Sequence, residues 1–209
     1  MPLSKIQAES MNLADTYAFT GTVTGTPSDM VLVNTTNITS ASVNTCDFTS
    51  LSTDYNHFVL KIGSFVPSGN GGQIIIRLQT TGSSGFASGS DNYDCTRNRV
   101  YGGGGSYTHN ASGFTATYGV AGIGQNSDGN GYVESGSHLT AYFYDVHSTT
   151  KGKGYTSIFW GGNDGGNTSH MISGVTYVGS GRTSALTGIR VQSSSGDVRG
   201  RFSLYGVKT

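Results

Sequence analysis

The residues best suited to bind a ligand lie at and after the only tryptophan of the chain. Trp160 ends an apolar run and is followed by a polar stretch that contains Asn163, Asp164 and Asn167. A tryptophan ring stacks on the CH face of a sugar, while amide and carboxylate groups bind sugar hydroxyls. These four residues form a candidate glycan-binding site. The competing interpretation, and the more common arrangement, buries Trp160 in the core beside a loop that only turns the chain.

Catalytic and metal chemistry find little support in the remaining residues. The histidines show neither H-x-H nor HExxH spacing and have no cysteine at zinc-ligand distance in the sequence; they are His57, His109, His138, His147 and His170. Asp91 and Asp94 could form an acid pair, but aspartate in such a Gly/Ser/Asn stretch is usually a turn residue. No G-x-S-x-G elbow and no phosphate-binding loop occurs. We therefore expect no catalytic residue, no metal and no cofactor.

Length and charge restrict the classes of partner. The 209 residues suit one domain, and acidic and basic residues balance to a net charge of +0. Without a basic stripe, nucleic acid is not an expected partner, and low charge suits a subunit that is covered by neighbours. The N-terminus lacks a signal-peptide pattern, and the aliphatic runs are too short to span a bilayer, so neither secretion nor membrane insertion is expected.

The elements that must position these residues are strands. Aromatic and β-branched clusters separated by glycine-rich breaks predict about eleven strands after residue 29, with no helical stripe between them. The predicted strands are Met30–Asn34, Ala41–Ser50, His57–Phe65, Gln73–Thr80, Asp94–Tyr101, Phe114–Val120, His138–Val146, Tyr155–Trp160, Met171–Val178, Ala185–Gln192 and Val198–Val207. This pattern predicts an all-β fold, an antiparallel β-sandwich.

Alternation within two of these strands predicts which face enters the core. Phe58, Leu60 and Ile62 share one face and Lys61 lies on the other. In the last strand, Val198, Phe202 and Leu204 oppose Arg199, Arg201, Ser203 and Tyr205. Charged and hydroxyl side chains are therefore expected on an outward face.

The two ends of the chain differ in pattern. Residues 1–15 match neither a helical face nor strict alternation and predict an extended arm, whereas residues 16–209 predict one sandwich domain that opens with a strand near residues 16–23. The two cysteines, Cys46 and Cys95, could form one disulfide, but reduced buried thiols are the commoner state.

The C-terminal segment SSSGDVRGRFSLYGVK at residues 193–208 resembles the closing strands of tailed-bacteriophage virion proteins that end in an S-G-N-I-x-x-G-x-F-x-L-Y-G-I-type motif. Residues 185–191 and 53–62 are similar to two other strands of that set, and residues 5–23 resemble the start of phage fibre or appendage proteins. Asp197 stands where the motif usually has asparagine, a change that a turn accepts readily.

The resemblance implies a jelly-roll-like sandwich in a tail fibre, a tail appendage or a capsid-surface protein, often a homotrimer. Its partners would be other virion proteins and copies of itself, with host cell-surface glycan as a further ligand, and it would be made in the host bacterial cytoplasm. A purely architectural role as capsid decoration or cement is the main alternative, and a polysaccharide depolymerase is the third. The resemblance transfers no catalytic residue.

Overall fold

The structure is a computed structural model. It describes residues 30–39, 43–67, 72–88, 92–101, 107–116, 119–123, 137–162 and 168–208. The predicted arm at residues 1–15, the predicted strand near residues 16–23 and the polar stretch at residues 163–167 lie outside these ranges.

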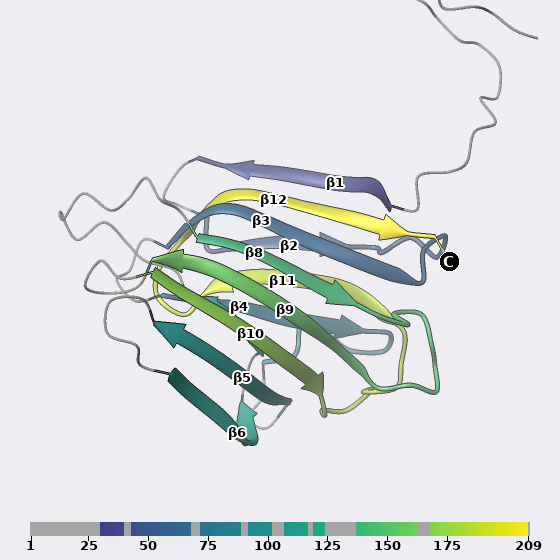
Figure 1. Ribbon diagram of the computed structural model, residues 1–209. Coiled ribbons are helices and arrows are strands. Elements are labelled where there is room, and N and C mark those ends of the chain that lie inside the picture. Colours follow the sequence, from purple (N-terminus) through teal and green to yellow (C-terminus); the bar gives the residue numbers. More distant parts are fainter. Residues whose placement is uncertain are drawn as a thin grey trace, which may run out of the picture.

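All regular structure in the described residues is β-strand, arranged in two sheets that form the two layers of a sandwich (Figure 1). The larger sheet contains, in spatial order, β1 (Met30–Ile38), β12 (Val198–Val207), β3 (His57–Pro67), β8 (Ser137–Phe143), β9 (Lys153–Gly162), β10 (Thr168–Tyr177), β5 (Tyr93–Tyr101) and β6 (Tyr107–Ala116). The smaller sheet contains β2 (Thr45–Thr49), β11 (Leu186–Ser193), β4 (Gln73–Thr80) and β7 (Gly119–Ile123). Neighbouring strands are antiparallel throughout. The predicted all-β antiparallel sandwich is confirmed.

The predicted strands overlap the observed ones, with bounds that differ by up to four residues, except around residue 117. β4 and β12 have the predicted bounds, but the predicted strand Phe114–Val120 is wrong. The predicted range includes the end of β6 and the start of β7, and these two strands belong to different sheets. β6 itself is rich in Gly, Ser, Thr and Asn, and it pairs with β5 at one end of the sheet order. Backbone pairing holds such a strand without the apolar alternation that reveals a core strand.

The core lies between the two sheets and is built by alternating residues. Phe58, Leu60 and Ile62 of β3 are buried in one apolar cluster, as predicted, together with Phe202 and Leu204 of β12. The ring of Phe202 lies edge-on to that of Phe65, with centroids 6.4 Å apart. These aromatic and aliphatic contacts remove apolar surface from water, and this burial holds the two sheets together.

Two aliphatic residues, Val59 of β3 and Ile75 of β4, are buried outside this core cluster. Ile75 lies between Ile74 and Ile76, which belong to the cluster, and points to the opposite face of the strand, yet it is only 1% exposed. β4 is therefore buried on both of its faces at this point.

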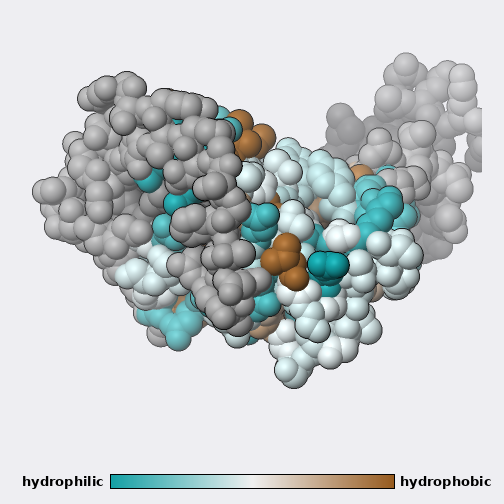
Figure 2. Space-filling model, turned by 90° about the horizontal axis from the view of Figure 1, so that it is seen from below, coloured by the Kyte–Doolittle hydropathy of each residue, from teal (hydrophilic) through white to brown (hydrophobic). Residues whose placement is uncertain are grey.

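The surface of the described residues agrees with the low charge of the sequence. Viewed from below, pale and hydrophilic residues cover most of the described face, and hydrophobic residues occur in small separate patches (Figure 2). The described residues include no helix long and apolar enough to cross a membrane.

Both cysteines are buried, and neither forms a disulfide. Burial raises the pKa of the Cys46 thiol to about 11, with a hydrogen bond from Thr36 opposing the shift and the charge of Asp47 adding to it. The neutral thiol is therefore the form that fits the folded protein.

This raised pKa predicts a loss of stability in alkali. Below the unfolded pKa of about 9 the contribution of Cys46 is fully present, and it is lost as the pH rises from 9 toward about 11, because only the unfolded chain releases the proton there. The loss amounts to about 2 to 3 kcal/mol for two pKa units. Denaturant titrations at pH 9 and at pH 11 give the difference in free energy of unfolding between the parent and Cys46→Ala. The loss is the change in this difference between the two pH values. An unchanged difference would refute this assignment.

Candidate functional site

The candidate site lies on the outer face of the larger sheet. In β9, the side chains of Tyr155, Ser157 and Phe159 point into the core, so Ile158 and Trp160 point outward. Trp160 is 48% exposed. The expectation that Trp160 fills the core is therefore wrong, because Phe159 occupies the inward position beside it.

Trp160 is held by a neighbouring ring. His138 of β8 is its register partner, and the two rings stack with centroids 5.8 Å apart and planes 30° apart. Both side chains stand on central strands of the sheet, so the indole presents its remaining surface from a rigid platform.

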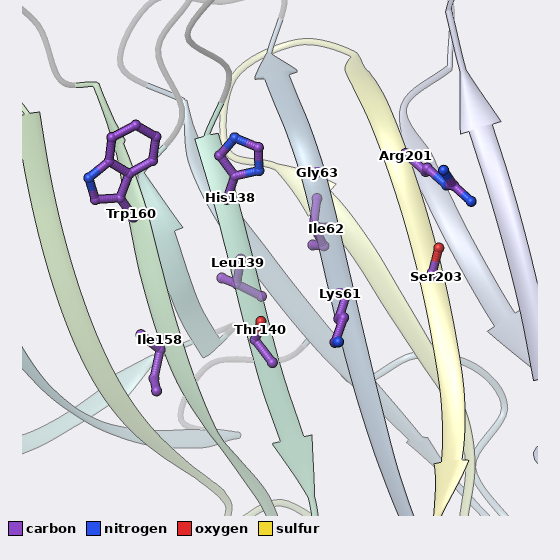
Figure 3. A pocket seen from close by; sticks show the side chains of 10 residues that line it. All are labelled: Lys61, Ile62, Gly63, His138, Leu139, Thr140, Ile158, Trp160, Arg201 and Ser203. Atoms are coloured by element: carbon purple, nitrogen blue, oxygen red, sulfur yellow. The ribbon is translucent and has the colours of Figure 1, made fainter. Parts of the chain in front are cut away.

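A groove of about 430 Å³ begins at this aromatic pair and runs across β8 and β3 to β12. Figure 3 shows Trp160 and His138 on one side, Arg201 and Ser203 of β12 on the other, and Gly63 of β3 between them. The space above Gly63 is open: a Cβ built there would meet only a nitrogen of His138, at 3.9 Å.

Two backbone irregularities shape the strands that form the floor of the groove. The register of β3 against β8 shifts between Ile62 and Phe65, and that of β12 against β3 shifts between Arg199 and Arg201. Gly200 has a φ of 141°, and a Cβ at this position would lie 3.0 Å from the carbonyl oxygens of Gly63 and Ser64, so only glycine fits well. Bulges of this kind redirect side chains and are frequent beside functional sites.

The polar groups of the groove are hydroxyls and cations. Thr140 and Ser203 supply the hydroxyls, and Lys61 and Arg201 supply the positive charges. The Lys61 ammonium lies over the Tyr205 ring, 5.3 Å from its centroid. Lys151 pairs with Asp145 and Arg190 with Asp47, whereas neither Lys61 nor Arg201 pairs with a carboxylate of the described residues.

Of the four predicted site residues, the structure describes Trp160 alone. Asn163, Asp164 and Asn167 follow β9 in the sequence but lie outside the described residues. The groove adds His138, Lys61 and Arg201, which the sequence did not assign to a site. Alternation had placed Lys61 and Arg201 on an outward face, and only the strand register brings that face beside Trp160.

A second hollow at the other end of β9 contains carboxylates. Asp94, one member of the predicted acid pair, lines it with Asp145 and Lys151, whereas Asp91 lies outside the described residues. The hydrogen bond from Lys151, 2.7 Å long, holds the pKa of Asp145 below its usual value. Asp145 is therefore ionised at neutral pH and unsuited to donate a proton as a general acid. No metal-binding group of three His, Cys, Asp or Glu occurs among the described side chains.

Comparison of the chain with protein-family models, curated protein sequences and solved structures gives no match.

Proposed function

We propose that this chain is a structural and adhesive subunit of a tailed-bacteriophage particle, in a tail fibre, tail appendage or similar part, and that it binds host surface glycan. The observation that carries the proposal is the only tryptophan of the chain, exposed on a rigid sheet at the edge of a groove. On a surface that binds no ligand, an indole would be more stable buried in the core. Exposed aromatic side chains of this kind are typical of binding sites, where they anchor a ligand.

The groove suits a carbohydrate because it pairs an apolar plane with hydrogen-bonding groups. The indole of Trp160 can accept the CH face of a sugar ring, and the neighbouring aliphatic Ile158 widens this apolar surface. Thr140 offers a hydroxyl that both donates and accepts, as sugar hydroxyls do, whereas Ser203 is buried and its hydroxyl already lies 3.0 Å from that of Thr35. The groove is open to solvent rather than enclosed, which fits a chain passing across it better than a small molecule held within it.

The phage assignment is supported by how the segments that carry the resemblance pack. Residues 53–62 and 193–208 include much of β3 and β12, which pair along their length. A Cβ at Gly206 would overlap the ring of Tyr55, so a glycine of one segment accommodates an aromatic residue of the other. The motif-like residues thus form one structural unit.

The strand order also supports the jelly-roll interpretation. Without the hairpins β5–β6 and β9–β10, two four-stranded sheets are left, β1-β12-β3-β8 and β2-β11-β4-β7. The chain passes from one sheet to the other at each step from β1 to β4 and again from β10 to β12. We infer that this is jelly-roll connectivity with two inserted hairpins.

Filling the groove tests the binding site without removing any group from it. The open space around Gly63 accepts a larger residue, and valine suits a strand. We expect Gly63→Val to fold like the parent and to lose binding to polysaccharide extracted from host cells, measured by calorimetric titration. Thr156→Val, an exposed change on the same face outside the groove, is the control. Parent-like binding by Gly63→Val would contradict the proposed site.

An architectural role is the second candidate, and exposed aliphatics on the same sheet favour it. Ile172 of β10 is 45% exposed and pairs in register with Ile158, while Val100 of β5 is exposed nearby in the same sheet. A surface of this kind suits contact with other copies of the chain, of which a homotrimer is the expected form.

This contact predicts an effect of charge on assembly. Ile172→Asp would place a carboxylate in the apolar contact, and we expect it to shift the oligomer toward monomer in light scattering, because the buried charge would have no partner. A parent protein that is itself monomeric, or an unchanged mass in the variant, would remove this surface from the assembly.

Two further measurements separate the remaining alternatives. Imaging of the intact particle distinguishes a fibre or appendage from capsid decoration or cement. Incubation with host polysaccharide tests the depolymerase alternative, which requires that the polysaccharide chains become shorter.

A further inference from the structure

The groove beside Trp160 is positively charged on one side. Lys61 and Arg201 both line it, and its lining contains no carboxylate among the described residues. Over the whole chain acidic and basic residues are equal in number. The charge of the groove is therefore a local feature, unlike the composition of the protein as a whole.

The two cations stand next to each other across a strand pair. Arg201 of β12 is the register partner of Gly63, and Lys61 of β3 is the register partner of Ser203, one pleat further along. Arg201 is exposed and Lys61 is exposed, so their charged groups are available to one ligand group. Arginine offers a planar fork that matches a carboxylate, and lysine adds a second charge.

The distance across the sheet determines how a ligand can reach both sides. Trp160 and Arg201 stand on β9 and β12, which are separated by β8 and β3. Three strand spacings amount to about 14 Å, more than the width of one sugar ring. A ligand that contacts both sides must therefore contain linked sugars.

We infer that the groove selects an acidic glycan, in which one sugar ring stacks on Trp160 and the carboxylate of a linked uronate binds Arg201 and Lys61. This inference rests on the proposed glycan-binding function and adds the ligand's charge. A neutral glycan would offer neither cation a carboxylate, whereas the carboxylate of an acidic sugar can bind both together.

The test compares acidic oligosaccharides with their carboxyl-reduced forms. Polygalacturonate and alginate oligosaccharides are titrated calorimetrically against the full chain, and each titration is repeated with the same oligosaccharide after its carboxylates have been reduced to alcohols. We expect the parent to bind at least one acidic probe, with about tenfold weaker binding to the reduced form, as loss of one charge-assisted contact would give. Arg201→Gln and Lys61→Gln should each reduce this preference.

Arg182→Gln is the matched control, because Arg182 is an exposed arginine outside the groove and its removal should leave the preference unchanged. Equal binding of acidic and reduced probes would overturn the inference and leave the proposed glycan-binding function standing. Absence of binding to both forms of both probes would overturn the inference, and if host polysaccharide also fails to bind, the proposed function falls with it. A preference that persists in both glutamine variants would also overturn it.

Discussion

Replacement of Trp160 by alanine is expected to abolish most glycan binding while leaving the fold intact. The indole is 48% exposed and contributes to no core contact, so its removal leaves no cavity between the sheets. Its stacking surface would be lost, at a cost to binding of about 2 kcal/mol, or roughly 30-fold in Kd, as for an aromatic anchor. Adsorption of the purified protein to host cells and calorimetric titration with host polysaccharide measure the effect.

Two controls separate the loss of the ring from damage to the protein. Trp160→Phe keeps an aromatic plane and should retain part of the affinity. Thermal unfolding of Trp160→Ala should match the parent within a few degrees. Unchanged adsorption by a folded Trp160→Ala protein would exclude this side chain from ligand binding.

Replacement of Phe202 by alanine is expected to cause a large loss of stability. Phe202 is fully buried on β12 and contacts the ring of Phe65 edge-on. Its strand pairs with both β1 and β3, so the side chain lies where the larger sheet packs onto the core. Loss of a buried aromatic ring costs about 3 to 5 kcal/mol, which lowers the Tm of a chain of this size by roughly 10 °C.

The neighbouring residue provides the control for this prediction. Arg201 precedes Phe202 on the same strand but points outward, so Arg201→Ala should change the free energy of unfolding by no more than about 0.5 kcal/mol. Chemical denaturation of both variants compares the two faces of β12 directly. Equal destabilisation by the two changes would contradict the assignment of the faces.

The core of the fold could be predicted from sequence because its strands alternate clearly. Phe58, Leu60 and Ile62 occur at every second position, which fixes the inward face of β3 without knowledge of its neighbours. The same reasoning placed Arg201 and Ser203 outward. β6 could not be found this way, since it lacks an apolar face and is held by backbone pairing with β5.

The orientation of Trp160 could not be predicted from the sequence, for a physical reason. Ile158, Phe159 and Trp160 are consecutive apolar residues, so alternation permits either Phe159 or its two neighbours to enter the core. Packing between the sheets decides in favour of Phe159.

The groove itself depends on strand register, which sequence periodicity does not specify. Lys61, His138 and Arg201 are far apart in the chain and meet only because β8, β3 and β12 are neighbours. The bulges near Gly63 and Gly200 then align them. Glycine in these strands was a visible signal for an irregularity, but not for which side chains would flank it.

Fluorescence of the only tryptophan measures directly whether its indole is exposed and whether a ligand covers it, because all indole emission from this chain comes from Trp160. We expect acrylamide to quench this emission readily in the free protein and saturating host polysaccharide to protect it. An emission that resists quenching in the folded free protein, or one that polysaccharide leaves unprotected, would contradict the proposal that an exposed Trp160 forms the platform of a glycan-binding groove.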